Sequence, residues 1–253
     1  MSSDDPGGDI VEDLRPLAEG AATLGLPLDG GQLMRFARYR ELLLDWNARI
    51  NLTAITDPAE VVTRHFLDSL TCVLVFPPEA RAAARTLLDV GAGAGFPGLP
   101  LAIALPSWRV TLLEATAKKV RFLEAVIAEL ELPNATTLTG RAEELGRQPR
   151  FRGAFDIVAA RAVAALPTLL EYCCPFAGVG GTTVMPKKGE LATELAAGAR
   201  AAPLLGAQLL TPIPIPLPTL SDDRVLVVAR QERPCPPQYP RAAGAPARRP
   251  LGT

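Results

Sequence analysis

One stretch of the sequence constrains the fold more than any other, because an apolar run, an acid and four glycines follow one another within it: Thr86-Leu87-Leu88-Asp89-Val90-Gly91-Ala92-Gly93-Ala94-Gly95-Phe96-Pro97-Gly98. The run Leu87–Val90 is typical of a buried strand. The glycines that follow let the backbone adopt positive φ and approach a ligand closely, and Pro97 suits the first turn of a helix. The stretch therefore predicts a strand, a ligand-binding turn and a helix, with a nucleotide-like cofactor at the turn.

The glycine spacing alone does not identify the cofactor, because Gly93-x-Gly95-x-x-Gly98 also matches the dinucleotide fingerprint. Asp89 stands just before the first glycine, Gly91, where its carboxylate can face a cationic amino group but would repel a pyrophosphate. This favours S-adenosylmethionine over a dinucleotide. Glu114 ends the next apolar run, Arg109–Glu114, and is placed to accept both ribose hydroxyls.

Composition excludes several classes of protein. Apolar stretches are broken well short of a membrane span and the start, Met1–Pro6, is acidic, so we expect a cytoplasmic protein that does not bind a membrane. A formal net charge of −1 argues against a protein that coats nucleic acid, so any contact with RNA must be local. The four cysteines form no C-x-x-C pair and the chain has one histidine, so we expect buried thiols and no metal site.

The hydrophobic pattern divides the chain into three parts. Residues 1–80 are predicted to form a helical amino-terminal extension, and residues 81–232 alternate between strand and helix patterns. Such alternation indicates a mostly parallel sheet covered by helices on both faces. The connection between the last two predicted strands, Gln208–Pro212 and Arg224–Val228, is short enough for antiparallel pairing. Residues 233–253 are rich in Pro, Arg and Ala, and we expect an irregular tail. The extension carries apolar residues at helical spacing at Leu33, Phe36, Tyr39, Leu42, Leu43 and Trp46.

Polar residues just before the predicted sheet, Arg64, His65 and Asp68, interrupt an otherwise apolar helical region. Arg64 and Asp68 are four residues apart, so one interpretation is an ordinary salt bridge along a helix. The histidine is as well explained by a structural role as by contact with a substrate.

Basic residues follow several of the predicted strands. Arg161 comes after the fourth strand, Arg141 after the third, and Lys187 and Lys188 after the fifth. The carboxyl ends of parallel strands share one edge, so these residues can form a phosphate-binding mouth, although each alone can also be an ordinary solvated side chain. The Arg161 guanidinium can bind a phosphate or donate to O6 and N7 of a guanine. If the acceptor is a guanine N7, its lone pair carries no proton, so alignment and electrostatics suffice without a general base.

Taken together, these motifs resemble the bacterial small-subunit ribosomal RNA (guanine-N7)-methyltransferases, the glucose-inhibited division protein B family. The resemblance runs from about residue 30 to the carboxyl terminus. The segments that carry it are Asn51–Ile55, Arg64–Ser69, Asp89–Pro100, Leu113–Leu123, Phe155–Ala162, Lys188-Gly189 and Tyr239–Pro246.

The resemblance implies a class I methyltransferase fold, an α/β Rossmann-like seven-stranded sheet with an antiparallel last strand and a helical amino-terminal extension. It implies S-adenosylmethionine as methyl donor. The implied acceptor is a guanine in the decoding-region loop of 16S ribosomal RNA. The substrate is either the RNA itself or the small ribosomal subunit, and the enzyme is expected to be a monomer. Loss of such enzymes is associated with low-level streptomycin resistance.

The resemblance and the residue patterns together assign roles to three groups. The predicted cofactor-binding residues are Asp89, Gly91, Gly93, Gly95, Phe96, Glu114, Ala142, Glu143 and Arg161. The predicted catalytic residues are Arg161, Arg64, Asp68 and Lys188, and the predicted RNA-binding residues are Arg64, His65, Arg141, Lys187 and Lys188. The chain departs from the family pattern at Phe96, where leucine is frequent, and at Ala142, where valine is common.

Two other functions fit part of the pattern. An NAD-dependent oxidoreductase would use the same glycine turn, but the sequence has no evident Tyr-x-x-x-Lys or comparable hydride-transfer acid. An RNA-binding protein without catalytic activity would be expected to have lost a glycine or an acid of the turn, and neither loss is visible.

Overall fold

The computed structural model describes residues 13–220 and 223–252. The acidic start, Met1–Pro6, lies outside these ranges, as do residues 221–222 of the connection between the last two predicted strands. The strands are β1 (Thr86–Val90), β2 (Arg109–Glu114), β3 (Ala135–Thr139), β4 (Phe155–Ala159), β5 (Ala177–Lys187), β6 (Ala207–Leu209), β7 (Ile213–Pro214) and β8 (Val225–Gln231). The longer helices are α2 (Arg15–Thr23), α3 (Gly30–Ile50), α7 (Gly98–Ala104), α8 (Ala117–Glu129), α10 (Leu166–Cys173) and α11 (Ala192–Leu204). The short helical segments are α4 (Pro58–Glu60), the π-helix η1 (Val61–Leu67), α5 (Asp68–Leu70), η2 (Thr71–Val75), α6 (Pro78–Arg81), α9 (Ala142–Leu145), η3 (Cys174–Phe176), η4 (Pro218–Leu220) and α12 (Ala245–Arg248).

The strands form one sheet in the order β3-β2-β1-β4-β5-β8-β6, with the two-residue strand β7 beside β8. Strands β1 to β5 are parallel to one another, whereas β8 is antiparallel to both β5 and β6. The predicted sheet with an antiparallel last strand is therefore confirmed. Strand β1 pairs with β2 on one side and β4 on the other, so the order of the strands reverses beside β1.

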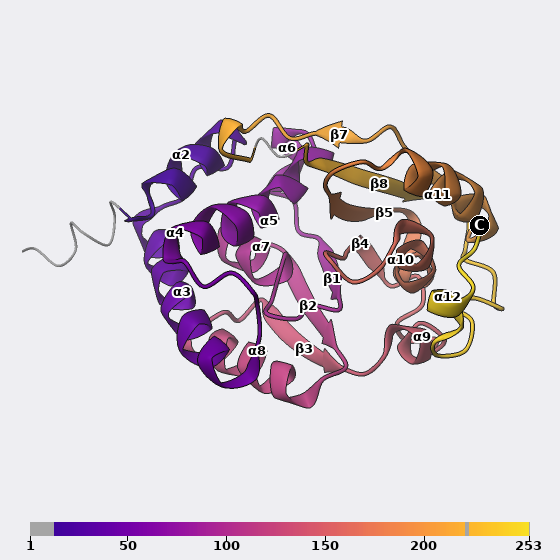
Figure 1. Ribbon diagram of the computed structural model, residues 1–253, viewed down its shortest axis with the longest axis horizontal. Coiled ribbons are helices and arrows are strands. Elements are labelled where there is room, and N and C mark those ends of the chain that lie inside the picture. Colours follow the sequence, from indigo (N-terminus) through magenta and orange to yellow (C-terminus); the bar gives the residue numbers. More distant parts are fainter. Residues whose placement is uncertain (1–12, 221–222, 253) are drawn as a thin grey trace, which may run out of the picture.

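Helices cover both faces of the sheet, as the alternating pattern predicted (Figure 1). Successive residues of β1 point to opposite faces: Leu87 belongs to the core beneath α7 and α8, and Leu88 to the core beneath α10 and α11. The four cysteines are buried and free, as expected.

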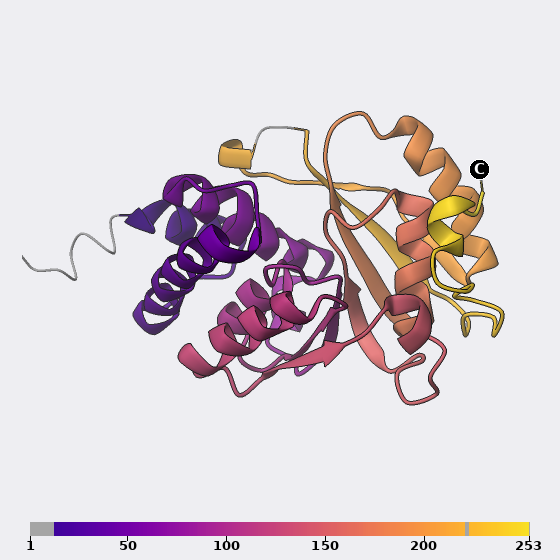
Figure 2. The ribbon, with the colours of Figure 1, turned by 60° about the horizontal axis from the view of Figure 1, so that its bottom comes forward.

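The amino-terminal helices form a further layer outside α7 and α8, on the side of the sheet away from α10 and α11 (Figures 1 and 2). Helix α3 begins at a capping box between Asp29 and Gln32. The Gln32 side-chain amide also donates to the carbonyl oxygens of Ile103 and Ala104, at 3.0 and 3.1 Å, where α7 ends. One side chain thus helps to start one helix and joins it to the end of another.

The tail from residue 233 onward packs against α10 and contains the short helix α12. Glu171 of α10 is fully buried. Its carboxylate accepts hydrogen bonds from the backbone N–H of Arg241 at 2.8 Å and from the Arg241 guanidinium at 2.6 to 3.1 Å. The Thr168 hydroxyl donates to the Pro246 carbonyl at 3.1 Å. The tail is therefore attached to the body through a buried ion pair.

We expect Arg241→Met to lower the free energy of unfolding by about 2–3 kcal/mol, because it leaves a buried carboxylate without its cation. The value lies at the low end for buried pairs, since Arg241 is partly exposed and its backbone N–H remains. Urea denaturation followed by circular dichroism measures the change. Arg248→Met, at an exposed position of the same tail, is the control, and equal effects of the two substitutions would contradict the assigned role.

None of the helices in the described part of the chain is both long and apolar enough to span a bilayer.

Candidate active site

A cleft of about 430 Å³ lies at the carboxyl ends of β1 and β2, next to the point where the strand order reverses. This is where open α/β sheets bind ligands. The glycine turn, the end of β2, the segment after β4 and the amino-terminal extension supply its walls. The lining residues are Leu52, Thr53, His65, Gly91, Ala92, Gly93, Ala94, Phe96, Glu114, Lys119, Arg161, Ala162 and Val163.

Gly93 and Glu114, which the sequence analysis assigns to cofactor binding, contact each other inside this cleft. The Glu114 carboxylate accepts from the Gly93 N–H at 3.0 Å and from the Thr116 N–H at 2.7 Å, which ties the turn to the end of β2. Gly93 has a φ of +60°, and a Cβ built on it would meet no other atom closer than 3.8 Å. The backbone at Gly93 is therefore bare toward the cleft, which fits a ligand that approaches the chain closely.

Gly95 has a packing role in this structure rather than the predicted contact with a cofactor. It does not line the cleft. A Cβ on Gly95 would lie 2.4 Å from the Leu99 side chain and 2.7 Å from the Tyr39 hydroxyl oxygen. The Tyr39 hydroxyl of α3 donates to the Ala94 carbonyl. The glycine is needed so that the amino-terminal extension can press against the back of the turn.

The structure also corrects the predicted orientation of Asp89. Its side chain is fully buried on the α7 face of β1, where the carboxylate accepts from the Gly98 N–H at 2.8 Å. Burial raises the pKa of Asp89 to about 7. Because alternation along the strand turns Asp89 toward the start of α7, its carboxylate supports the turn from beneath and does not line the cleft.

Phe96 forms an apolar wall of the cleft and joins it to the extension. Its ring stacks on His65, with centroids 4.4 Å apart and planes inclined by 21°. The guanidinium of Arg161 lies 4.9 Å from the centre of the same ring, within the range of a cation–π contact. Phe96, His65 and Arg161 therefore form one packed group.

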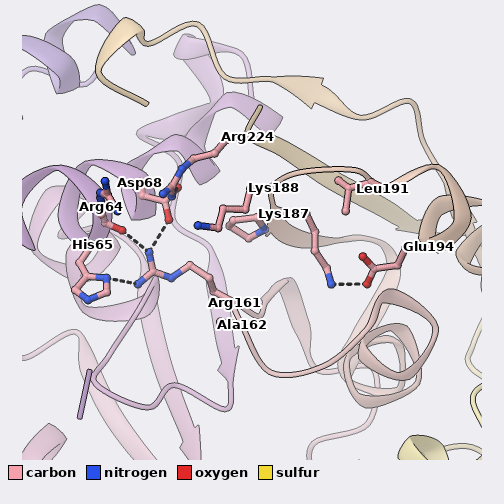
Figure 3. A pocket seen from close by; sticks show the side chains of 11 residues that line it. Arg64, His65, Asp68, Arg161, Ala162, Lys187, Lys188, Leu191, Glu194 and Arg224 are labelled. Carbon is pink, nitrogen blue, oxygen red and sulfur yellow. Dashed lines mark hydrogen bonds and ion pairs between the residues drawn. The ribbon is translucent and has the colours of Figure 1, made fainter. Parts of the chain in front are cut away.

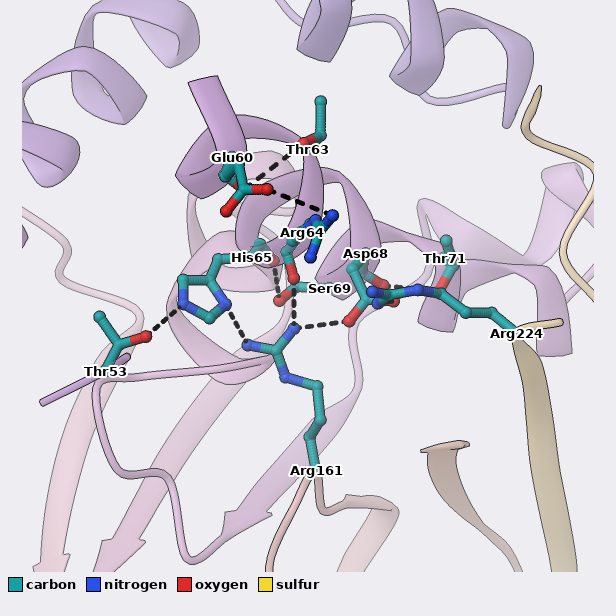
Figure 4. A network of polar contacts seen from close by, with 10 residues as sticks. All are labelled: Thr53, Glu60, Thr63, Arg64, His65, Asp68, Ser69, Thr71, Arg161 and Arg224. Carbon is teal, nitrogen blue, oxygen red and sulfur yellow. Dashed lines mark hydrogen bonds and ion pairs between the residues drawn. The ribbon is translucent and has the colours of Figure 1, made fainter. Parts of the chain in front are cut away.

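Arg161, just after β4, connects the sheet to the extension (Figure 4). Its guanidinium donates to the Asp68 carboxylate at 2.6 Å, to the Arg64 carbonyl at 3.1 Å and to Nδ1 of His65 at 3.2 Å. The residues that receive these bonds lie on η1 and at the start of α5. π-helices such as η1 are rare in proteins, and those that occur often lie at functional sites.

The alternative interpretation of Arg64 and Asp68, a salt bridge between them along one helix, is wrong. Arg64 is exposed, and its side chain pairs with Glu60 at 3.2 Å. Asp68 points inward instead and is nearly buried, with a side chain only 3% exposed. The two side chains point to different sides because η1 is wound as a π-helix and its inner face docks on the sheet.

The partner that sequence reasoning missed is Arg224, just before β8. It pairs with the second oxygen of Asp68 at 2.6 Å, and its side chain is 10% exposed. Asp68 thus holds Arg161 on one side and Arg224 on the other (Figure 4). No sequence motif marks Arg224. It lies 156 positions after Asp68 in the chain, too far for a local pattern to link the two. Its basic charge at the start of a predicted strand was the one available signal.

His65 is held as a neutral imidazole with a defined tautomer. Because Nδ1 accepts from Arg161, the proton resides on Nε2, which donates to the Thr53 hydroxyl oxygen 2.7 Å away. Burial and the neighbouring Arg161 cation lower the pKa of His65 to about 3. His65 therefore carries no charge with which to bind RNA, and its ring serves as a packed, uncharged surface.

We expect the imidazole signals of the folded protein to show no titration between pH 8 and about pH 5, in contrast to an ordinary histidine with a pKa near 6.5. The chain has one histidine, so NMR spectra identify it without ambiguity. The folded pKa is lower than the unfolded one, so the histidine's contribution to stability is complete above about pH 6.5 and is lost as the pH falls toward 3. The urea-unfolded protein is the control, and a folded-state midpoint near 6.5 would contradict the assigned hydrogen bonds.

A second cavity, of about 360 Å³, adjoins the cleft (Figure 3). We call it the base pocket, and we call the first cavity the cofactor cleft. The base pocket is lined by Arg64, His65, Asp68, Arg161, Ala162, Pro186, Lys187, Lys188, Leu191, Glu194 and Arg224. His65, Arg161 and Ala162 line both cavities. The two sites therefore meet at these residues.

The two lysines of the base pocket differ in their surroundings. Lys187 is 16% exposed, and its ammonium group donates to Glu194 at 2.6 Å and to the Ala164 carbonyl at 3.0 Å. The ammonium of Lys187 is therefore paired with a neighbouring carboxylate, and its predicted contact with RNA stays a prediction. Lys188 is exposed at the rim.

Three other predicted site residues, Arg141, Ala142 and Glu143, line neither the cofactor cleft nor the base pocket. Arg141 is exposed at the start of α9. The Glu143 carboxylate is buried and accepts from the Gly244 N–H of the tail at 3.0 Å. The short helix turns this acid toward the tail and away from both cavities.

The chemistry that this arrangement allows is transfer between two molecules bound side by side. The cofactor cleft offers bare backbone, an acid at the end of β2 and an apolar ring, which suit a nucleoside-type cofactor. The base pocket is ringed by cationic side chains, three of which are arginines. The buried histidine is neutral and hydrogen-bonded on both nitrogens, so it is not positioned as a general base.

Comparison with known proteins gives concordant matches. The family model GidB, described as rRNA small subunit methyltransferase G, matches residues 32–212. The chain is 47% identical over 231 residues to ribosomal RNA small subunit methyltransferase G of Roseiflexus sp. (strain RS-1), a match that covers 91% of this chain and 97% of the relative. It is 43% identical to the protein of the same name from Exiguobacterium sibiricum, over 91% of this chain and 96% of the relative.

Solved structures resemble the chain in fold. One is the putative methyltransferase in complex with the Haloferax volcanii Trm112 methyltransferase activator, with a TM-score of 0.54 and 14% identity over 76% of this chain and 98% of that one. Another is the fibrillarin pre-rRNA processing protein of Methanococcus jannaschii, with a TM-score of 0.50 and 18% identity over 64% of this chain and 74% of that one. At these identities the likeness concerns the fold alone.

Proposed function

Because the chain belongs to the rRNA small subunit methyltransferase G family, we propose that it transfers a methyl group from S-adenosylmethionine to N7 of one guanine in the decoding-region loop of 16S ribosomal RNA. Membership of the family makes it a methyltransferase of small-subunit ribosomal RNA. The main observation that supports the proposed transfer is that the two cavities meet at Arg161, His65 and Ala162. A donor and an acceptor bound on either side of this junction would be direct neighbours.

The residues of the cofactor cleft fit S-adenosylmethionine. Glu114 keeps lone pairs for ribose hydroxyls beyond the two backbone N–H groups that it accepts. The exposed backbone at Gly93 allows close approach, and Phe96 supplies an apolar wall. When bound, S-adenosylmethionine supplies an electrophilic methyl group. The role of the surrounding residues is to hold the donor still and to exclude water.

The base pocket suits an electron-rich base that needs no deprotonation. A guanine N7 carries a lone pair and no proton, so the absence of a poised base among the lining residues is compatible with the reaction. The pocket's cations can orient the base through O6 and the neighbouring phosphates. Alignment of two bound reactants contributes about 7–11 kcal/mol to lowering a barrier, so we assign most of the catalysis to positioning.

We further propose that the enzyme acts as a monomer in the cytoplasm, where ribosomal subunits are assembled. The partner is the ribosomal RNA, either free or within the small subunit.

The decisive experiment is transfer of labelled methyl groups to small subunits purified from a strain that lacks this gene. We expect one methyl group per subunit, mapped to N7 of a single guanine. Subunits from the parent strain, already modified, are the control and should accept none. Labelling of an adenine, or of a guanine at another atom, would contradict the N7 proposal and leave the methyltransferase activity intact.

A further inference from the structure

A third cavity, of about 590 Å³, lies directly beside the base pocket. Leu191 and Arg224 line both cavities, so the two form a continuous depression. We call the third cavity the side groove. None of the residues predicted from the sequence to form the site lines it, and the methyl transfer proposed above does not require it.

The walls of the side groove are mostly apolar and firmly attached, and the exposed carboxylates of Glu190 and Asp223 also line it. The start of α11 forms one wall with Ala192 and Leu195, and the segment around β7 forms the other with Pro212, Pro214 and Ile215. Pro214 pairs with β8 in the sheet, and Ile215 packs against the hydrophobic core. Aliphatic and proline side chains of this kind can pack against the apolar face of a nucleic-acid base, whichever base it is.

Arg224 stands at the boundary between the base pocket and the side groove. Its ion pair with the buried Asp68 at 2.6 Å fixes the guanidinium there. Successive bases of an RNA strand are joined through one phosphate, and arginine is well suited to contact phosphate oxygens. A cation between two base-sized cavities therefore matches the spacing of charge in a strand whose neighbouring bases enter both.

We infer that the side groove is a second nucleotide subsite, which takes the base adjacent to the target guanine while the linking phosphate lies near Arg224. This inference rests on the proposed function. It implies that the substrate is an unpaired loop with two neighbouring bases turned outward, since sequence-specific RNA recognition targets unstacked bases. The flanking base would contribute to binding of the RNA and not to binding of the methyl donor.

The test is Ala192→Glu, which fills part of the groove and adds a third carboxylate to Glu190 and Asp223, which already line it. The new side chain cannot pack against a base and repels a nearby phosphate. Ala192 is exposed, so the fold should persist. Ala196→Glu is the matched control, because Ala196 is exposed on the same helix, gives the same change in charge and lies outside the groove lining. We expect kcat/KM on unmethylated small subunits to fall about 10-fold or more for Ala192→Glu, mainly through KM, in line with the loss of one stacked base.

Two further measurements separate the possible outcomes. The dissociation constant of S-adenosylmethionine should stay within about twofold in both variants, and Ile215→Ala on the opposite wall should also raise KM for subunits. If the unsubstituted protein methylates subunits and Ala192→Glu behaves like Ala196→Glu, the second subsite is wrong and the proposed function stands. If the unsubstituted protein binds the donor but methylates no subunits, the proposed function itself fails, and the inference fails with it.

Discussion

Replacing Arg161 with alanine is expected to lower kcat/KM for methylation of small subunits by about two to three orders of magnitude, a loss typical of removing one preorganised charged donor from an active site. Arg161 lines both cavities and simultaneously contacts Asp68, His65 and the Phe96 ring. Without it, the wall between the cofactor cleft and the base pocket loses its cation, and Asp68 and His65 lose the donor that orients them. Radiolabel transfer at varied subunit concentration measures the effect.

The fold should survive this substitution, because Asp68 keeps its ion pair with Arg224. Circular dichroism and thermal unfolding check that point. Arg109→Ala is the matched control, since Arg109 is exposed at the opposite, amino-terminal edge of the sheet, at the start of β2. Arg161→Lys should recover little activity, because an ammonium cannot reproduce the planar, multidirectional hydrogen bonding of a guanidinium. Turnover within threefold of the unsubstituted enzyme would remove Arg161 from the reaction.

Gly93→Asp is expected to weaken binding of S-adenosylmethionine by at least about 10³-fold, because an unpaired carboxylate in a partly buried site costs several kcal/mol. The new side chain would project into the cofactor cleft, where the nearest atom to a Cβ is the Gly91 carbonyl oxygen at 3.8 Å. It would also place a second negative charge beside Glu114, whose carboxylate accepts the Gly93 N–H. Isothermal titration calorimetry with S-adenosylmethionine measures the loss.

Two controls separate the contributions of charge, bulk and backbone conformation. Gly93→Ala keeps the space nearly empty and tests the cost of a side chain at φ +60°. Gly180→Asp introduces the same carboxylate at another glycine of positive φ, +81°, with nothing within 4 Å, away from the cleft. Gly180→Asp should bind the donor normally. Binding by Gly93→Asp within tenfold of the unsubstituted protein would mean that the turn does not hold the donor.

The parts of the site that could be predicted from the sequence are those set by local spacing. Gly93 lies just after the first strand and Glu114 ends the second, so the sequence could place both at one edge of the sheet. Arg161 could be placed at the same edge for the same reason, at the end of β4. The helical extension was also predictable, because Phe36, Tyr39 and Leu43 recur at helical spacing and are buried.

Side-chain direction and long-range pairing could not be predicted in the same way. Asp89 and Glu143 lie near the expected places in the chain, but Asp89 turns beneath the glycine turn and Glu143 turns toward the tail. Lys187 is neutralised by Glu194 within the pocket. In each case the partner is chosen by the packing of another element, which leaves no trace in the spacing around the residue.

By itself, the sequence of this protein determined the strand and helix order and the ligand-binding edge of the sheet. These follow from periodicity, from glycines where the backbone must approach a ligand, and from acids at strand ends, all of which act over a few residues. Only the tertiary structure decided that Asp68 joins Arg161 to Arg224, and that two cavities meet there. The physical reason is that a buried carboxylate must find cations wherever the fold brings them, and distance along the chain sets no limit on which residues those are.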